Sequence, residues 1–203
     1  MAPDDRLLGA YFFPIEVGMN LSYEVEEINY RNNGEVDTSR FYVIDSITEK
    51  QTEGNQDRYY GYRLRKESLV GASTVLYAIQ YLVSDQTIVQ QIGNQKSVVF
   101  SLPVQEGKSW NANGSASPAD EFQYFKVFQT YDRGDTVFQE TVQVLEEENY
   151  DSLELLDVRI KVYAAQTGLI ESLISQLEFC VENDCFGLQE IEFGTTTSMK
   201  RVF

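Results

Sequence analysis

Apolar and polar residues alternate along much of the chain. Between residues 156 and 164 every second position is apolar, and residues 21–26 follow the same rule. A period of two is typical of a strand with one face on a core and the other in water. Residues 41–47 repeat the pattern, although Asp45 interrupts it. Residues 75–83 are apolar on both alternating faces, which predicts a strand that is covered on both sides.

Residues that favour turns separate these runs at intervals of roughly 8 to 15 residues. Asn32-Asn33-Gly34, Gly93-Asn94 and Asp132-Arg133-Gly134-Asp135 are examples. Consecutive hairpins follow from this spacing, so we expect the sheet to be antiparallel. The pattern predicts about ten strands, near residues 19–30, 38–50, 57–69, 73–84, 87–93, 96–103, 121–131, 136–146, 155–165 and a C-terminal pair around 170–180 and 186–202.

A meander of this length has a problem at its edges, because unpaired strand edges invite pairing with other chains. Curling the sheet into a barrel or half-barrel solves it. The 13 Tyr, 12 Phe and 1 Trp residues suit that shape, since large rings fill the concave side of a bent sheet. We therefore expect a single all-β domain over residues 1–203, an antiparallel meander curled into a barrel or half-barrel. A two-sheet β-sandwich is the alternative.

The segment 168–179 fits two periodicities. Apolar residues recur at helical spacing, which predicts a short amphipathic helix packed on the sheet. The same segment taken as a strand also places apolar residues on one side. We favour the strand. The residues that carry both patterns are Leu169, Ile170, Leu173, Ile174, Leu177 and Phe179.

The two cysteines, Cys180 and Cys185, bracket a polar segment rich in turn-forming residues. If residues 177–180 and 185–191 pair as strands, the cysteines face each other across a four-residue hairpin loop, within the range that a disulfide accepts. Two free thiols are the alternative. The pair cannot complete a tetrahedral zinc site, because the chain has no further Cys and no His. We expect a disulfide and hence an oxidising compartment.

Charge and composition exclude several kinds of chemistry. The chain has 16 basic and 32 acidic residues, a formal net charge of −16, and no histidine. Hydrolases with an imidazole base, most zinc sites and histidine pH switches are therefore excluded. The negative charge also disfavours nucleic acid, whose binding depends largely on Lys and Arg. Runs of Asp and Glu are typical of solvated faces. We expect no catalytic residue, no metal and no cofactor, and we do not expect an enzyme.

Two short motifs resemble functional ones. Gly107-Lys108-Ser109 resembles the end of a phosphate-binding loop, but Leu102 stands where that motif needs a glycine. Arg133-Gly134-Asp135 spells an adhesion tripeptide on a turn that we expect to be exposed. Its simpler interpretation is a good hairpin turn.

The N-terminus bears on the compartment. Residues 1–5 are acidic, where a signal peptide carries positive charge followed by an apolar block. We interpret residues 1–10 as an extended tail that follows a removed export signal, with a cytoplasmic protein as the alternative. The most apolar stretch, residues 71–83, has 13 residues, and a transmembrane helix needs about 20.

Three stretches resemble elements of secreted, uncharacterised lipoproteins of Gram-negative bacteria. Residues 13–18 with Tyr23, and residues 102–110, are similar to their paired "FPLxxG…W/Y" elements, and residues 162–170 to their C-terminal "YAxxxGLI" element. The resemblance implies an exported, mostly antiparallel β protein of the periplasm, the outer membrane or the cell surface. It further implies that the protein meets the membrane only through a lipidated cysteine upstream of residue 1.

The preferred function is a non-catalytic accessory or interaction module of the cell envelope, with an unknown envelope protein as partner. One alternative is a β-barrel carrier of a small apolar ligand. Another is a carbohydrate-binding module that uses exposed tyrosines for stacking. An open or a filled concave side discriminates the carrier from the other two. The candidate ligand-binding residues are Tyr60, Tyr62, Tyr77, Tyr81 and Trp110, and we expect the four tyrosines to share the concave side.

Overall fold

The computed structural model describes residues 9–68, 70–114, 118–151, 153–182 and 184–203. Within them the chain is all-β apart from one short 3-10 helix. The helix is η1 (Ala10–Phe12), and the strands are β1 (Asn20–Tyr30), β2 (Val36–Glu53), β3 (Gln56–Lys66), β4 (Thr74–Val83), β5 (Thr87–Ile92), β6 (Gln95–Ser101), β7 (Ser109–Asn111), β8 (Glu121–Asp132), β9 (Val137–Asp151), β10 (Leu155–Ala164), β11 (Gly168–Phe179) and β12 (Ile191–Arg201).

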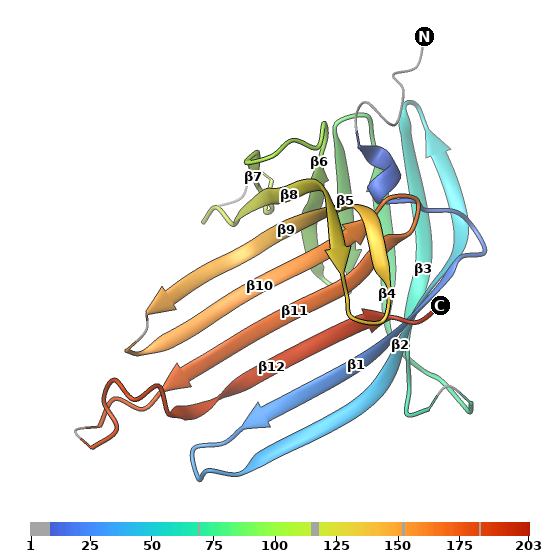
Figure 1. Ribbon diagram of the computed structural model, residues 1–203. Helices are drawn as coiled ribbons and strands as arrows, with labels where there is room; N and C mark the ends of the chain where they lie inside the picture. The colour runs from blue at the N-terminus through green and yellow to red at the C-terminus, as the bar shows by residue number, and fades with distance from the viewer. Residues whose placement is uncertain (1–8, 69, 115–117, 152, 183) are drawn as a thin grey trace.

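All twelve strands belong to one antiparallel sheet, in the order β6-β5-β4-β3-β2-β1-β12-β11-β10-β9-β8-β7. The prediction of an all-β antiparallel meander is confirmed, and residues 168–179 form a strand, as favoured. The predicted number of strands is too low, because β7 was not expected. With one sheet in the described chain, the sandwich alternative is wrong. The strands β1 and β12 pair in the middle of the sheet (Figure 1).

The sheet curls until its two edge strands meet. Val98 of β6 donates its backbone N–H to the carbonyl of Ala112, which follows β7, at 2.7 Å. The indole Nε1 of Trp110 in β7 donates to the carbonyl of Val98, also at 2.7 Å. These contacts bring the edges together into a nearly closed barrel, so few of the edge groups are left to pair with other chains.

Aromatic side chains close one end of the barrel. Phe12 of η1 is fully buried, and the neighbouring Phe13 packs edge-on against Tyr81 and Phe100. Phe100 also contacts Tyr163 edge-on, with ring centroids 4.7 Å apart. Edge-to-face contacts of this kind are the favoured arrangement of buried rings. Because Ala10 belongs to η1, the extended tail predicted for residues 1–10 does not reach Ala10; residues 1–8 lie outside the described residues.

The end of the β8–β9 hairpin folds back over the outside of β10 and β11 (Figure 1). There Tyr131 donates its hydroxyl hydrogen bond to the carboxylate of Glu171 at 2.6 Å. Arg133 donates to the carbonyls of Arg201 at 2.7 Å and Ile170 at 3.3 Å, and its side chain is only 3% exposed. The prediction of an exposed tripeptide is therefore wrong for Arg133, which holds the hairpin to the sheet.

The disulfide between Cys180 and Cys185 is confirmed, with the two Cα atoms 5.8 Å apart. Its predicted setting is wrong. The strand β11 ends before Cys180 and β12 begins only at Ile191, so the bond closes a loop beyond the strands rather than joining two of them. The loop turns in a helical manner, with the N–H of Phe186 donating to the carbonyl of Glu182. No helix of the described chain is long and apolar enough to cross a membrane.

Candidate functional site: a central cavity and an outer groove

A cavity of about 770 Å³ occupies the concave side of the sheet beyond its aromatic end. Small and aliphatic side chains line much of it, because Ser172 of β11 and Thr197 and Met199 of β12 face inward there. Val25 of β1 and Val43 of β2 complete this wall. The volume lies within the range of pockets that hold small molecules. Part of the concave side is therefore filled by rings and part is open.

Two ion pairs lie in the wall of this cavity. Arg63 of β3 makes a two-pronged contact with Asp45 of β2, with N–O distances of 2.7 and 2.6 Å. Asp45 is 3% exposed. Lys161 of β10 contacts Glu146 of β9 at 2.6 Å. Buried charges require such partners, because removing one partner leaves an uncompensated charge away from water. Both carboxylates are therefore held by cations.

The charge of the cavity wall differs from that of the whole chain. Its charged residues are four cations, Arg63, Lys96, Arg159 and Lys161, and three anions, Asp45, Asp120 and Glu146. Arg159 is paired with Asp157 behind the wall at 2.6 Å, so the wall is close to neutral, while the chain has a formal charge of −16. Within the described chain, Lys96 makes no ion pair. A cavity of this composition favours a neutral or anionic polar group over a cationic one.

Three buried tyrosines border the aromatic end of the cavity. Burial raises the pKa of Tyr23 and of Tyr81 well above the usual value, and the nearby carboxylate of Asp45 raises both further. Burial also raises the pKa of Tyr163, with Glu146 adding to the effect. These hydroxyl groups are therefore protonated at neutral pH and can donate hydrogen bonds.

Several of the polar atoms around the cavity have no partner in the protein. Tyr81 accepts a hydrogen bond from Gln90 at 2.8 Å. Within the described chain, however, the hydroxyls of Tyr23 and Tyr163 form no hydrogen bond, although these residues are 1% and 3% exposed. The hydroxyl of Ser97, on the same cavity, is buried and also unpaired. Buried polar groups are normally hydrogen-bonded, so the buried hydroxyl of Ser97 indicates a place for a polar group of a ligand or for water, to which the hydroxyls of Tyr23 and Tyr163 can also donate.

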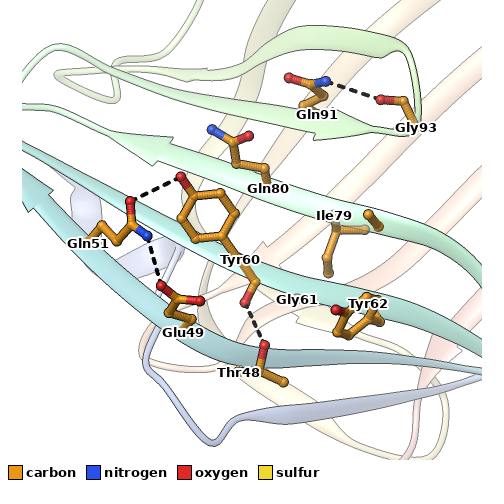
Figure 2. A pocket seen from close by; sticks show the side chains of 11 residues that line it. Thr48, Glu49, Gln51, Tyr60, Gly61, Tyr62, Ile79, Gln80, Gln91 and Gly93 are labelled. Atoms are coloured by element: carbon orange, nitrogen blue, oxygen red, sulfur yellow. Dashed lines mark hydrogen bonds between the residues drawn. The ribbon is translucent and has the colours of Figure 1, made fainter.

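A second, shallower groove of about 430 Å³ crosses the outside of β2 to β5. Figure 2 shows Tyr60 beside Gln51, to which its hydroxyl donates at 3.4 Å. Gln51 in turn donates to Glu49 at 2.8 Å. Tyr62 lies two residues along β3 and is 49% exposed. The groove thus combines two phenol rings with side chains that accept and donate hydrogen bonds.

The four candidate tyrosines do not share one side of the sheet. Tyr77 and Tyr81 line the central cavity, whereas Tyr60 and Tyr62 line the outer groove. The prediction that the four tyrosines share the concave side is therefore wrong. Side chains of one strand alternate between the two faces of a sheet. Tyr60 and Tyr62 pair with Gln80 and Ala78, which face outward. Ligand binding by these tyrosines stays a prediction.

The fifth candidate, Trp110, lies at the seam of the barrel. Its hydrogen bond to Val98 joins the sheet edges, and its ring packs on Tyr124 with centroids 4.4 Å apart. This environment gives Trp110 a structural role. Lys108 of the phosphate-loop look-alike is also structural, since its ammonium group donates to the carbonyls of Ser101 and Pro103, each at 3.0 Å.

Sequence analysis did not single out the polar groups of the cavity. Asp45 gave a signal, since it interrupts an apolar alternation at a position that is buried in the fold. Its partner Arg63 gave no signal, because arginine residues are mostly exposed. Tyr23 and Tyr163 stand in the stretches that resemble lipoprotein elements, but nothing in the pattern indicates that their hydroxyls lack partners.

Comparison with known proteins gives one structural match. No protein-family profile matches the chain, and no curated protein matches its sequence. The matching solved structure is that of a protein of Bacteroides fragilis NCTC 9343, described as a presumed exported protein with a YmcC-like fold. The two are 10% identical, with a TM-score of 0.47, and the match covers 95% of this chain and 98% of the other.

Proposed function

We propose that the protein is an exported, non-catalytic carrier of the cell envelope that holds a small amphipathic molecule in its central cavity. The observation that carries the proposal is the pairing of an apolar wall with the unpartnered hydroxyls of Tyr23, Tyr163 and Ser97 on one cavity. An apolar body would lie against the aliphatic wall, and a polar group would accept the hydrogen bonds that the protein itself leaves unmade.

The disulfide supports export, because such bonds persist mainly in oxidising compartments. The resemblance to secreted lipoproteins supports an anchor through a cysteine upstream of residue 1. Labelling with radioactive palmitate in the native host tests the anchor: the proposal requires label on the mature protein, and its absence contradicts anchoring while leaving the carrier proposal intact.

The open cavity favours the carrier over the interaction module, which otherwise stays a prediction. A protein that acts only through its outer surface has no need of an unfilled interior, and a filled core is the more stable arrangement. The unpaired cation Lys96 in the wall further favours a neutral or anionic polar group on the ligand.

The test uses 1-anilinonaphthalene-8-sulfonate, an apolar probe with an anionic group, and two matched variants. Thr197 faces the cavity, whereas its neighbour Thr196 does not line it. We expect the probe to bind the folded protein and Thr197→Phe to weaken that binding at least about tenfold, because the ring takes up part of the space that the probe needs. Thr196→Phe should bind as the unmodified protein does. Equal affinities in all three, or no binding at all, would overturn the carrier.

A further inference from the structure

The outer groove has a structural origin in one strand irregularity. The pairing of β2 with β3 shifts register between Ile47 and Glu49, which leaves Thr48 unpaired as a bulge. Opposite the neighbouring Ile47 stands Gly61, where an added Cβ would lie 1.9 Å from the carbonyl oxygen of Ser46. Only glycine permits so close an approach of two backbones. The backbone of Gly61 lines the groove beside Tyr60, while its absent side chain would point to the inner face, like those of its partners Ile47 and Ile79.

Small residues continue this floor across the sheet. Ala78 of β4 lies opposite Tyr62, and Gly93, after β5, donates its N–H to the carbonyl of Ala78. Both line the groove. Because the residues next to Tyr62 are small, its ring stands free on the sheet surface instead of packing against a neighbour. Figure 2 shows Tyr60 and Tyr62 along the same strand, with Gln80 on the next strand.

The chemistry of the groove is polar and lacks cations. Its polar lining consists of Thr48, Glu49, Gln51, Tyr60, Tyr62, Gln80 and Gln91. No Lys or Arg of the described chain lines it. Phosphates and sulfates are therefore poor ligands, because their recognition depends on Arg and Lys. Amides, a carboxylate and hydroxyls instead suit a ligand with many neutral hydroxyl groups, which both donate and accept.

Part of this hydrogen-bonding capacity is unused. In the described chain, neither the amide of Gln80 nor the hydroxyl of Tyr62 forms a hydrogen bond with the protein. Tyr60 and Tyr62 are two residues apart, a distance of about 7 Å along the strand, so their rings can meet neighbouring units of a linear chain. Ring faces bind the apolar faces of sugars, and the surrounding polar groups bind their hydroxyls.

We propose that this outer groove is a binding site for a neutral saccharide, with Tyr62 as the stacking ring and Gln80 and Glu49 as hydrogen-bonding groups. The site is separate from the central cavity and goes beyond the carrier function. It gives the protein two ligand-binding faces, one on each side of the same strands.

The test titrates cellohexaose, maltohexaose and xylohexaose into the full chain by isothermal calorimetry. Tyr62→Ala is compared with Tyr77→Ala, since Tyr77 is 50% exposed on the neighbouring strand but lines the cavity instead. We expect at least one of the three to bind. Tyr62→Ala should weaken it about tenfold, the effect of a lost ring contact. Tyr62→Phe, which keeps the ring, and Tyr77→Ala should retain the affinity.

Two results would overturn the proposal. One is the absence of binding for all three saccharides at concentrations up to about 10 mM. The other is an equal loss in Tyr62→Ala and Tyr77→Ala, which would place the saccharide elsewhere. Thr197→Phe separates the two proposals, because it narrows the cavity and should leave saccharide binding unchanged.

Discussion

The concave side of the sheet has two regions that differ in how they are filled. At the aromatic end Phe12, Phe100 and Tyr124 are fully buried, and the rings of Phe100 and Tyr124 pack edge-on against each other. Around the cavity the inward residues of β11 and β12 include Ser172 and Thr197, which are too small to reach across the barrel. The same strand geometry thus gives a solid core or an open space according to side-chain size.

This difference predicts unequal responses to truncation. Phe100→Ala removes a ring from a filled region, and we expect it to lower the free energy of unfolding by about 4 kcal/mol. Met199→Ala, in the cavity wall, should lower it by about 1.5 kcal/mol, since it adds to an existing space. Urea denaturation of the two variants measures both values. Equal losses would mean that the two regions are packed alike.

The ion pair in the cavity wall gives the next largest effect. Arg63→Met leaves the carboxylate of Asp45 buried without its cation, and we expect a loss of about 3 kcal/mol. The double variant Asp45→Leu with Arg63→Met removes both charges and should recover most of that stability. Thermal or urea denaturation checks this. A double variant no more stable than the single one would show that the pair itself stabilises the wall.

Alkaline pH tests the buried tyrosines between the two regions. The pKa values of Tyr23, Tyr81 and Tyr163 are raised in the folded protein, so the unfolded chain loses these protons first as the pH rises. The stability they contribute is complete below about pH 10 and decreases above it. At about pH 10.5 we expect a loss of about 2.5 kcal/mol, roughly 0.8 from each. Denaturation at several pH values measures the total decrease, to which Tyr124 and Tyr131 add because burial also raises their pKa values, and Tyr163→Phe should reduce it by roughly 0.8 kcal/mol.

The smallest expected effect is the loss of stability on removing one buried tyrosine hydroxyl, which we compare at two positions. Tyr124 accepts from the N–H of Ser101 at 3.0 Å and donates to its carbonyl at 3.2 Å, whereas the hydroxyl of Tyr163 has no protein partner in the described chain. Tyr124→Phe should cost about 1 kcal/mol at neutral pH, and Tyr163→Phe less than about 0.5 kcal/mol. Urea midpoints measure both. A larger loss for Tyr163→Phe would contradict the absence of a partner for that hydroxyl.

Much of the fold could be predicted from the sequence. Alternation and turn residues indicate strands wherever a long run has one wet face, as in β1 and β10. The three-residue β7 is too short to show any period. The disulfide could be predicted from spacing, but its loop could not, because the turn in which Phe186 donates to Glu182 is held by local backbone hydrogen bonds that leave no periodic pattern in the sequence.

The candidate sites were harder to predict than the fold. Which face of β3 turns inward depends on its register with β2, and the bulge at Thr48 changes that register. A shift of one residue moves every side chain to the other face, so Tyr60 and Tyr62 could not be assigned from alternation alone. The cavity depends on the sizes of side chains from strands that are distant in the sequence.

The order of the strands has a consequence for how the chain could be rearranged. Strands β6 and β7 end the sheet, yet only residues 102–108 separate them, while β1 and β12 pair at its centre. A circular permutant that is opened within residues 102–108, with its old ends linked, would run from β7 through β12 and on from β1 to β6. Every neighbouring pair would then be a sequential hairpin, and the seam at Val98 and Trp110 would be held without a covalent connection.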